Sequence, residues 1–194
     1  MARSNPEARL RLVATAADML RRRGMNATSI RELAKAANAP LGSTYHYFPD
    51  GKKQVITEAI QFAGNKISSM LETALKQGAK SGLQSFLHVW RDVIESTNFN
   101  AGCPVIAAAM EEATNDDIDA AREAAATVFN KWQKLISETL ITEGIKRKQA
   151  NALATMIIAS TEGALAMCRA TKDIKPFDQV TEQLHLLLDI ALAQ

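Results

Sequence analysis

Residues that cross-link or punctuate a chain are scarce in this sequence of 194 residues, which has two cysteines, five prolines, nine glycines and three histidines. Cys103 and Cys168 form no CxxC pair, so a zinc ribbon and a disulfide framework are excluded. We expect both thiols to be buried as small apolar groups, with a redox switch as the alternative. His88 and His185 have no metal-ligand partners near them in the sequence, and we expect His46 to be a surface group. The sequence thus predicts neither a metal site nor a bound cofactor.

Aromatic residues make up only 5% of the chain, and no segment alternates apolar and polar residues as a half-buried strand would. Apolar residues recur instead at spacings of three and four, which predicts an all-α protein. No apolar run approaches the ~20 residues of a membrane span. The first residues contain no apolar segment of the kind that directs secretion, so we expect a cytoplasmic location and no membrane partner.

The motifs that mark common enzyme active sites are also missing. There is no nucleophile elbow, no glycine-rich phosphate loop that opens a helix, and no HExxH pair. The acidic pairs Glu111-Glu112 and Asp116-Asp117 are explained by helix capping and solvation without acid-base chemistry. We therefore expect a protein that is not an enzyme.

Charge is divided unevenly along the chain. Residues 1–53 contain ten Lys and Arg against four Asp and Glu, whereas residues 54–194 contain thirteen against seventeen. The first segment is therefore basic and the second mildly acidic, which indicates that the N-terminal segment alone meets a polyanion such as DNA. Charge by itself does not establish this, because many basic segments are simply solvated surface.

Three helices are predicted in the N-terminal segment. The first ends near Gly24, a usual helix stop, and carries one apolar face. The second begins at Ser29 with Glu32 three places on, the pattern of a capping box, and closes near Ala37. A tight turn follows at Asn38, and the third helix runs over about 41–47. The apolar face expected for the first helix consists of Leu10, Val13, Ala14, Ala17 and Leu20.

Longer helices follow from residue 52 onwards. Pro104 suits the first turn of a short helix, and Asn115 with the two aspartates after it supplies the cap and the N-terminal negative charge of a long one. The predicted ranges are about 52–77, 81–97, 104–110, 115–143, 150–170 and 177–192.

The last two predicted helices are apolar on more than one face. Two parallel rows are apolar from 150 to 170, and the stretch 184–190 is apolar nearly all round. A helix with two apolar faces must bury both, one of them against its own domain. We expect the other to pair with a second copy of the chain, which gives a two-fold homodimer built on four helices. The alternative is a helix pair that is wholly internal.

The sequence SIRELAKAANAPLGSTYHYF, residues 29–48, combines a short helix, a tight turn and a second short helix. In a helix-turn-helix this spacing lets the first helix brace against the DNA backbone while the second lies in the major groove. The second helix begins with three small residues that permit close approach, followed by side chains whose hydroxyls and ring nitrogen can reach phosphates and base edges. These residues are Gly42, Ser43, Thr44, Tyr45, His46 and Tyr47. We expect Phe48 to pack in the core.

The same stretch resembles the TetR family of bacterial repressors, whose recognition helix ends in a YHYF-type sequence. The residues that follow, FPDGKKQ at 48–54, resemble the PGGKEQL segment of the LmrA/YxaF branch. A distant match, Gly102-Cys103-Pro104-Val105 before an alanine-rich helix, resembles the GCP motif in the effector domain of that branch. The resemblance implies a helix-turn-helix domain, expected over 1–51, and a helical domain for effector binding and dimerisation, expected over 52–194.

The resemblance also assigns roles to individual positions. It implies DNA contacts by Arg31, Ser43, Tyr45 and Tyr47. It implies a phosphate contact by Lys52 at the N-terminus of the next helix, where the helix dipole also favours an anion.

Two positions depart from the family pattern. Pro40 stands where many members have a capping Ser or Thr, and Leu41 where many have a polar or basic residue. We expect Leu41 to touch a thymine methyl group or simply to reduce the number of polar DNA contacts. We expect the run Arg21-Arg22-Arg23 to be a solvated helix end that the dipole stabilises, with direct DNA contact as the alternative.

Large, adaptable side chains lie on different predicted helices of the C-terminal segment. Such groups can line a pocket for a small hydrophobic or aromatic molecule, although each is also a candidate for ordinary core. Cys103, at the junction between a loop and a helix, is the thiol that we expect at such a pocket. The other residues expected to bind the effector are Phe86, Trp90, Met110, Phe129, Trp132 and Met156.

These features predict a ligand-responsive repressor that binds a pseudo-palindromic operator in double-stranded DNA as a homodimer. A small molecule that prefers a second arrangement of the helical domain would release it from the operator. The alternatives are an activator of the same family and a helical small-molecule-binding protein without a DNA function.

Overall fold

The structure is a computed structural model that describes residues 5–111 and 116–193, and within these ranges it contains helices and no strand. This confirms the predicted all-α class. The helices are α1 (Pro6–Arg23), α2 (Ile30–Ala36), α3 (Leu41–Tyr47), α4 (Gly51–Ala74), the 3₁₀ turn η1 (Leu75–Gln77), α5 (Ala79–Ser96), α6 (Pro104–Ala109), α7 (Asp116–Thr142), α8 (Arg147–Thr171) and α9 (Lys175–Leu192).

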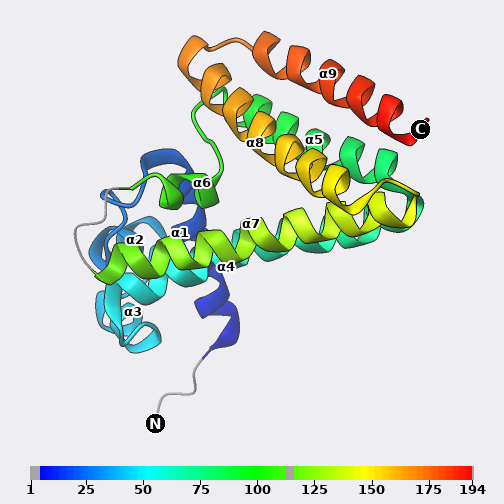
Figure 1. Ribbon diagram of the computed structural model, residues 1–194. Helices are drawn as coiled ribbons and strands as arrows, with labels where there is room; N and C mark the ends of the chain where they lie inside the picture. The colour runs from blue at the N-terminus through cyan, green and yellow to red at the C-terminus, as the bar shows by residue number, and fades with distance from the viewer. Residues whose placement is uncertain (1–4, 112–115, 194) are drawn as a thin grey trace. The chain divides into compact units, whose positions relative to one another are not determined.

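The chain forms two compact units, each assembled from two separate segments. Unit 1 consists of Met1–Asn65 and Pro104–Val128, and unit 2 consists of Lys66–Cys103 and Phe129–Gln194. Helices α4 and α7 therefore each begin in unit 1 and end in unit 2. Figure 1 shows α1, α2, α3 and α6 gathered about the beginnings of α4 and α7. The domain boundary expected after residue 51 divides the chain by function and stays a prediction.

Helix α1 is capped at both ends by the residue types that its sequence supplies. The Asn5 Oδ1 atom accepts hydrogen bonds from the backbone N–H groups of Glu7 and Ala8, at 3.1 and 3.3 Å. At the other end Gly24 has a φ of 75°, a left-handed conformation that glycine adopts without a steric penalty. The predicted stop at Gly24 is confirmed.

The buried face of α1 is rotated about the helix axis from the predicted one. Leu10 is 56% exposed, so its assignment to the core was wrong. The apolar contacts are centred near Ala16, and Leu10 lies about a third of a turn away from that direction. The buried residues of the helix are Leu12, Val13, Ala16, Ala17, Met19 and Leu20.

The helix-turn-helix segment follows the predicted pattern closely. The Ser29 Oγ atom accepts a hydrogen bond from the Glu32 N–H at 3.2 Å, which caps α2. Asn38 adopts the expected left-handed conformation with a φ of 50°, and the turn leads directly into α3. Pro40 precedes α3 without offering a side-chain cap, which is what its ring chemistry dictates.

Unit 1 also contains a close approach of two long helices. A Cβ atom added at Gly64 on α4 would lie 2.4 Å from Cγ2 of Val128 on α7, so glycine is needed there for the helices to come together. Next to α6, the Glu111 carboxylate accepts a hydrogen bond from the Met25 N–H at 3.1 Å. This contact ties the end of α1 to the segment that follows α6, and α1 and α6 pack on each other.

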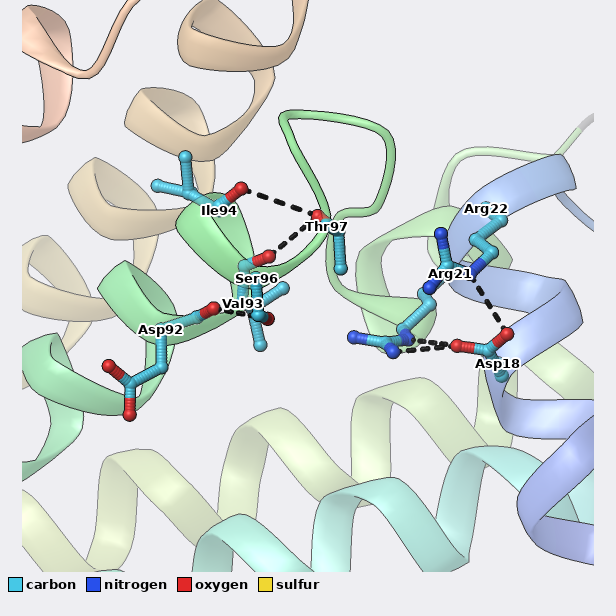
Figure 2. Close-up of polar contacts among 8 residues, drawn as sticks. All are labelled: Asp18, Arg21, Arg22, Asp92, Val93, Ile94, Ser96 and Thr97. Carbon is cyan, nitrogen blue, oxygen red and sulfur yellow. Dashed lines mark hydrogen bonds and ion pairs between the residues drawn. The ribbon is translucent and has the colours of Figure 1, made fainter.

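In unit 2, α8 packs on α9, and α5 packs on both of them. The side-by-side placement of these three helices is visible in Figure 1. The Glu143 carboxylate accepts a hydrogen bond from the Ala79 N–H at 2.7 Å and so caps α5. At the far end of α5 the hydroxyls of Ser96 and Thr97 donate to carbonyls one turn back (Figure 2).

Helix α8 begins three residues before the predicted start, because Arg147-Lys148-Gln149 are good helix formers that carry no apolar periodicity.

Helices α8 and α9 each keep an exposed apolar side in addition to the buried one, as the sequence predicts. The exposed large apolar residues on them are Met156, Met167, Leu186, Leu187 and Ile190. By length and composition alone, α8 would pass as a membrane-spanning helix, but half of its apolar window is buried inside the protein. Helices that form protein cores commonly pass the same test, so this finding adds no membrane assignment.

Candidate nucleic-acid interface and aromatic core

Helix α3 turns one face to solvent and the opposite one to the core of unit 1. Thr44 and Phe48, one helical turn apart, are both fully buried. The Thr44 hydroxyl donates to the Pro40 carbonyl at 3.1 Å. The Thr44 side chain is therefore turned away from any DNA on the open face, which corrects the contact expected of it. The exposed residues of the helix are Leu41, Gly42, Ser43, Tyr45 and His46, with Tyr45 exposed by 53%.

Phe48 and Tyr47 fix the end of α3 against other parts of unit 1. The Phe48 ring lies under the Arg9 guanidinium, 5.4 Å from the ring centroid, and its expected place in the core is confirmed. Tyr47 is half-buried, and its hydroxyl oxygen accepts a hydrogen bond from the Asn5 N–H at 3.1 Å. The phenolic proton of Tyr47 remains able to donate outward.

Three of the five arginines of α1 form ion pairs with carboxylates of unit 1. Arg21 and Arg22 both contact Asp18, at 2.6 and 2.9 Å, as Figure 2 shows. Arg9 contacts Glu58 of α4 at 2.5 Å. Burial opposes ionisation of Asp18, but the hydrogen bonds and charges of the two arginines outweigh it and lower the pKa of this carboxyl. Arg21 and Arg22 thus have intramolecular partners, which favours the structural interpretation of these two residues over a direct DNA contact.

Two other cations of unit 1 are differently placed. Arg31 on α2 is exposed, and Lys52 at the start of α4 is half-buried. Among the described residues, neither has a carboxylate within ion-pair distance. Lys52 also lies in the first turn of a 24-residue helix, where the backbone dipole attracts an anion. Both side chains can therefore bind external phosphates.

Four of the residues expected at an effector pocket form one aromatic cluster in unit 2. Trp132 lies at its centre, with ring centroids 6.0 Å from Phe86, 6.3 Å from Trp90 and 5.7 Å from Phe129, all in tilted or edge-to-face arrangements. Phe86, Trp90 and Trp132 are buried. The cluster joins α5 to α7.

The two methionines expected with this cluster are both exposed. Met110 follows α6 in unit 1 and is 79% exposed, and Met156 is 41% exposed on the outer side of α8. Helical phase turns Met156 toward α9, and Met110 lies beyond the last helical turn of α6. That both methionines share a pocket with the aromatic residues stays a prediction. Met156 instead lines a shallow groove with Leu187 and Ile190.

Both cysteines are buried, as expected. Cys168 donates to the Ile174 carbonyl at 3.7 Å, and burial raises the pKa of its thiol. Cys103 lies at the end of the loop before α6 and contacts the carboxyl of Glu162. Within residues 5–111 and 116–193, no group of three or more His, Cys, Asp and Glu could hold a metal ion.

Glu162 is a buried carboxyl that the sequence analysis did not single out. It is 3% exposed on α8, and burial raises the pKa of its carboxyl to about 7, an effect that the hydrogen bond from the Cys103 thiol offsets only in part. The available signal was its position: Glu162 interrupts the apolar rows from 150 to 170, where a carboxylate is unexpected.

Comparison with protein families places both parts of the chain. Residues 12–59 match the family of bacterial regulatory proteins described as the tetR family. Residues 79–183 match the C-terminal domain described as that of LmrA/YxaF-like transcriptional regulators. The second match covers the aromatic cluster, Cys103 and Glu162.

Individual proteins agree with these matches. An uncharacterized HTH-type transcriptional regulator of Mycobacterium tuberculosis (strain ATCC 25618 / H37Rv) is 37% identical over 185 residues, which cover 93% of each chain. The HTH-type transcriptional repressor DhaR of Mycobacterium sp. (strain GP1) is 28% identical, with 88% of this chain and 87% of that protein covered. The crystal structure of a TetR transcriptional regulator from Legionella pneumophila superimposes with a TM-score of 0.83 at 22% identity, over 96% of this chain and 99% of that one.

Proposed function

We propose a specific role for this chain, which belongs to the TetR family of bacterial regulatory proteins and is a transcriptional regulator with an LmrA/YxaF-like C-terminal domain. It binds a pseudo-palindromic operator in double-stranded DNA as a homodimer and represses the adjacent gene in the cytoplasm. A small hydrophobic or aromatic molecule enters unit 2 and releases the DNA. The repressor sign is supported by the relative that is named a repressor.

The exposed face of α3 carries the DNA-binding part of this proposal. Ser43, Tyr45 and His46 offer donors and acceptors on an open helix whose opposite side is anchored by Thr44 and Phe48. Gly42 leaves space on the same face, because a Cβ added there would meet no atom within 4 Å. A short, rigid helix with an open polar face fits the major groove, where base edges are read.

Phosphate contacts supply the affinity. Arg31 and Lys52 flank α3 in the chain, and both are free of ion pairs with described carboxylates. Each phosphate that a cation neutralises releases counterions, so the binding constant falls steeply as salt is raised. Leu41, 38% exposed, adds an apolar contact of the kind that a thymine methyl group accepts.

The experiment is selection of bound duplexes from random DNA, followed by titration of variants on the recovered site. Y45A is expected to cost about 1–3 kcal/mol of binding and to relax the preference at the bases it reads. K52A should weaken binding to all sequences and reduce the slope of log K against log salt by about one. The matched control is K148A, an exposed lysine of unit 2, which should leave both the affinity and the slope unchanged. Normal binding by Y45A and K52A would refute the contact assignment.

The outer sides of α8 and α9 support the dimer. On α8, Met156, Ser160, Gly163 and Met167 recur at helical spacing along one line, and a Cβ added at Gly163 would meet nothing within 4 Å. Several large apolar side chains exposed together on neighbouring helices are a liability in a monomer. A second copy that packs these helices into a four-helix interface would bury them and set two α3 helices about 34–36 Å apart, or a multiple of it, in successive major grooves.

Charge placed on this surface tests the dimer. M167E should yield monomers in light scattering. It should also lose operator affinity, because a single helix-turn-helix contacts only one half of the operator. M110E is the control, since Met110 is 79% exposed and belongs to unit 1, whereas α8 and α9 belong to unit 2. If M167E remains a dimer, the interface lies elsewhere.

The proposed release of the operator depends on helices α4 and α7, which run through both units. Helices α4 and α7 are continuous between the two units, so a ligand that shifts their distal halves also acts on unit 1. A differential affinity of about 1–3 kcal/mol would lower operator affinity about 5–150-fold. A reporter fused to the neighbouring promoter, with and without the gene, gives the sign: deletion is expected to raise expression, and a fall would indicate an activator.

A further inference from the structure

The interior of unit 2 holds polar atoms that lack a partner. Both carboxyl oxygens of Glu162 and the Nε1 atom of Trp90 are buried, and within the part of the chain that the structure describes they meet no hydrogen-bonding nitrogen or oxygen. Each of the two residues is 3% exposed. Buried polar groups in proteins are almost always paired, because leaving one unpaired forfeits its hydration without replacement. Two such groups on α5 and α8, which pack on each other, need a reason.

Glu162 stands apart from every other buried polar side chain whose burial is described. Apart from the Trp90 indole, the others carry hydroxyls alone, and Thr161 beside Glu162 satisfies its hydroxyl on the Ile157 carbonyl at 2.7 Å. No described lysine or arginine is buried that could neutralise a carboxylate. An apolar residue would fill this position at lower cost to folding, so stability of the fold does not explain a carboxyl here. The buried polar residues are Thr28, Thr44, Ser68, Thr97, Ser137, Thr161 and Glu162.

The surroundings select the charge of a partner. The Cys103 thiol, a weak donor, satisfies Glu162 only in part. The cluster centred on Trp132 adds aromatic rings from α5 and α7, and the faces of such rings attract cations. A carboxylate and aromatic faces inside one helical unit both repel an anion and both favour a positive charge. A cation would also bring the donor that the Glu162 oxygens lack.

We infer that Glu162 is the residue with which unit 2 recognises its effector, and that the effector is an aromatic molecule bearing a positively charged nitrogen. This inference rests on the proposed function, and it narrows the effector from any hydrophobic or aromatic molecule to an organic cation. The ammonium group donates to Glu162, the ring stacks in the aromatic cluster, and Trp90 Nε1 donates to any oxygen that the effector carries. Because Glu162, Trp90 and Trp132 are buried, an effector that reaches them displaces packed side chains of α5, α7 and α8 and thereby couples binding to a change of shape.

Three matched probes of one size separate charge from shape: 1-naphthylmethylammonium, 1-naphthylmethanol and 1-naphthoate. Calorimetric titration of the full-length protein should show that the ammonium binds about tenfold or more tightly than the alcohol, and that the carboxylate binds more weakly than either. In E162Q the alcohol should bind as in wild type, while the preference for the ammonium disappears. E182Q, which removes an exposed carboxylate of α9, is the control and should keep the preference.

The variants also test whether Glu162 is structural. Because its oxygens have no nitrogen or oxygen partner, E162L should melt at or above the wild-type temperature in a circular dichroism scan. If E162L and E162Q both fail to fold, Glu162 is a structural residue and the inference is wrong. Binding of the probes without a charge preference, or a preference that survives in E162Q, also overturns it. If none of the three probes binds at millimolar concentration, the effector site of the proposed function itself fails.

Discussion

The two compact units differ in whether all of their described buried polar side chains are paired. In unit 1 the buried hydroxyls of Thr28 and Thr44 donate to the carbonyls of Gly24 and Pro40, at 3.0 and 3.1 Å. In unit 2 the Trp90 Nε1 atom and both Glu162 oxygens are buried without such partners among the described residues. Among the residues described in unit 1, no buried side-chain nitrogen or oxygen lacks a partner, and such complete pairing favours one stable arrangement, which suits a helix that must fit a groove of fixed shape. A unit with unpaired groups in its core can gain from a ligand that satisfies them.

The largest expected effect removes the centre of the aromatic cluster in unit 2. W132A should lower the free energy of unfolding by about 3–5 kcal/mol, because Trp132 is fully buried and contacts three aromatic rings. Urea unfolding at equilibrium measures the loss. W132F is the control and should recover most of the stability, since it keeps an aromatic ring in the cluster. A loss below about 1 kcal/mol in W132A would mean that the cluster is loosely packed.

The second-largest expected effect is a pH dependence of stability that arises from Glu162 in unit 2. Burial raises the pKa of Glu162 in the folded protein to about 7 from its ordinary value of 4.5. The contribution of the protonated carboxyl to the free energy of unfolding is therefore fully present below pH 4.5 and is lost as pH rises through 7. Wild type should therefore lose about 3 kcal/mol more than E162Q between these limits. Urea unfolding of both proteins at pH 5 and pH 8 gives the difference. Identical pH profiles would show that Glu162 finds a partner when it ionises.

A glycine exchange probes the rigidity of unit 1. G64A should cost about 1–3 kcal/mol, because the added methyl group would lie 2.4 and 2.6 Å from the two Cγ atoms of Val128, whose branched side chain has little freedom. Thermal melting measures the loss, and adding V128A should restore most of it. G42A is the matched control: the site is open and helical, so the melting temperature should hold or rise. Equal melting of G64A and wild type would show that α4 and α7 separate easily.

The smallest effect concerns the arginines of α1. D18N should lower the unfolding free energy by about 0.2–1 kcal/mol at neutral pH, because the ion pairs with Arg21 and Arg22 are partly exposed. The pKa of Asp18 is lowered in the folded state, so its contribution is present at neutral pH and is lost as pH falls through the folded pKa. Denaturant titrations at neutral and acid pH should show the gap between D18N and wild type closing in acid. A gap that widens in acid would contradict the assigned pairs.

Local patterns predicted the helix-turn-helix well because its determinants lie within a few residues of one another. The cap at Ser29, the left-handed Asn38 and the bounds of α3 all depend on such short-range chemistry. The buried face of α1 was mispredicted, since it depends on which neighbouring helix covers which side. Periodicity marks that a helix has an apolar stripe, but not the direction in which tertiary packing turns it.

Glu162 illustrates a second limit of prediction from sequence, which is that partners on different helices cannot be identified. A carboxylate in an apolar helix is visible in the sequence, yet the sequence does not show whether a lysine from another helix pairs with it. The missing partner becomes apparent only when the burial of all other charged residues is known. The same holds for Arg31 and Lys52. They are free to bind phosphate because Asp18 and Glu58 form their ion pairs with other arginines, and the sequence does not show these pairs.

The most direct test of the central claim is an anisotropy titration of a selected operator duplex at two salt concentrations, with the stoichiometry read from the same curves. We predict that an even number of chains binds each duplex, and that affinity falls by about 10³–10⁵ between 50 and 200 mM salt if six to ten phosphates are contacted. A single chain per duplex, or an affinity for every selected duplex that salt leaves unchanged, would contradict the account.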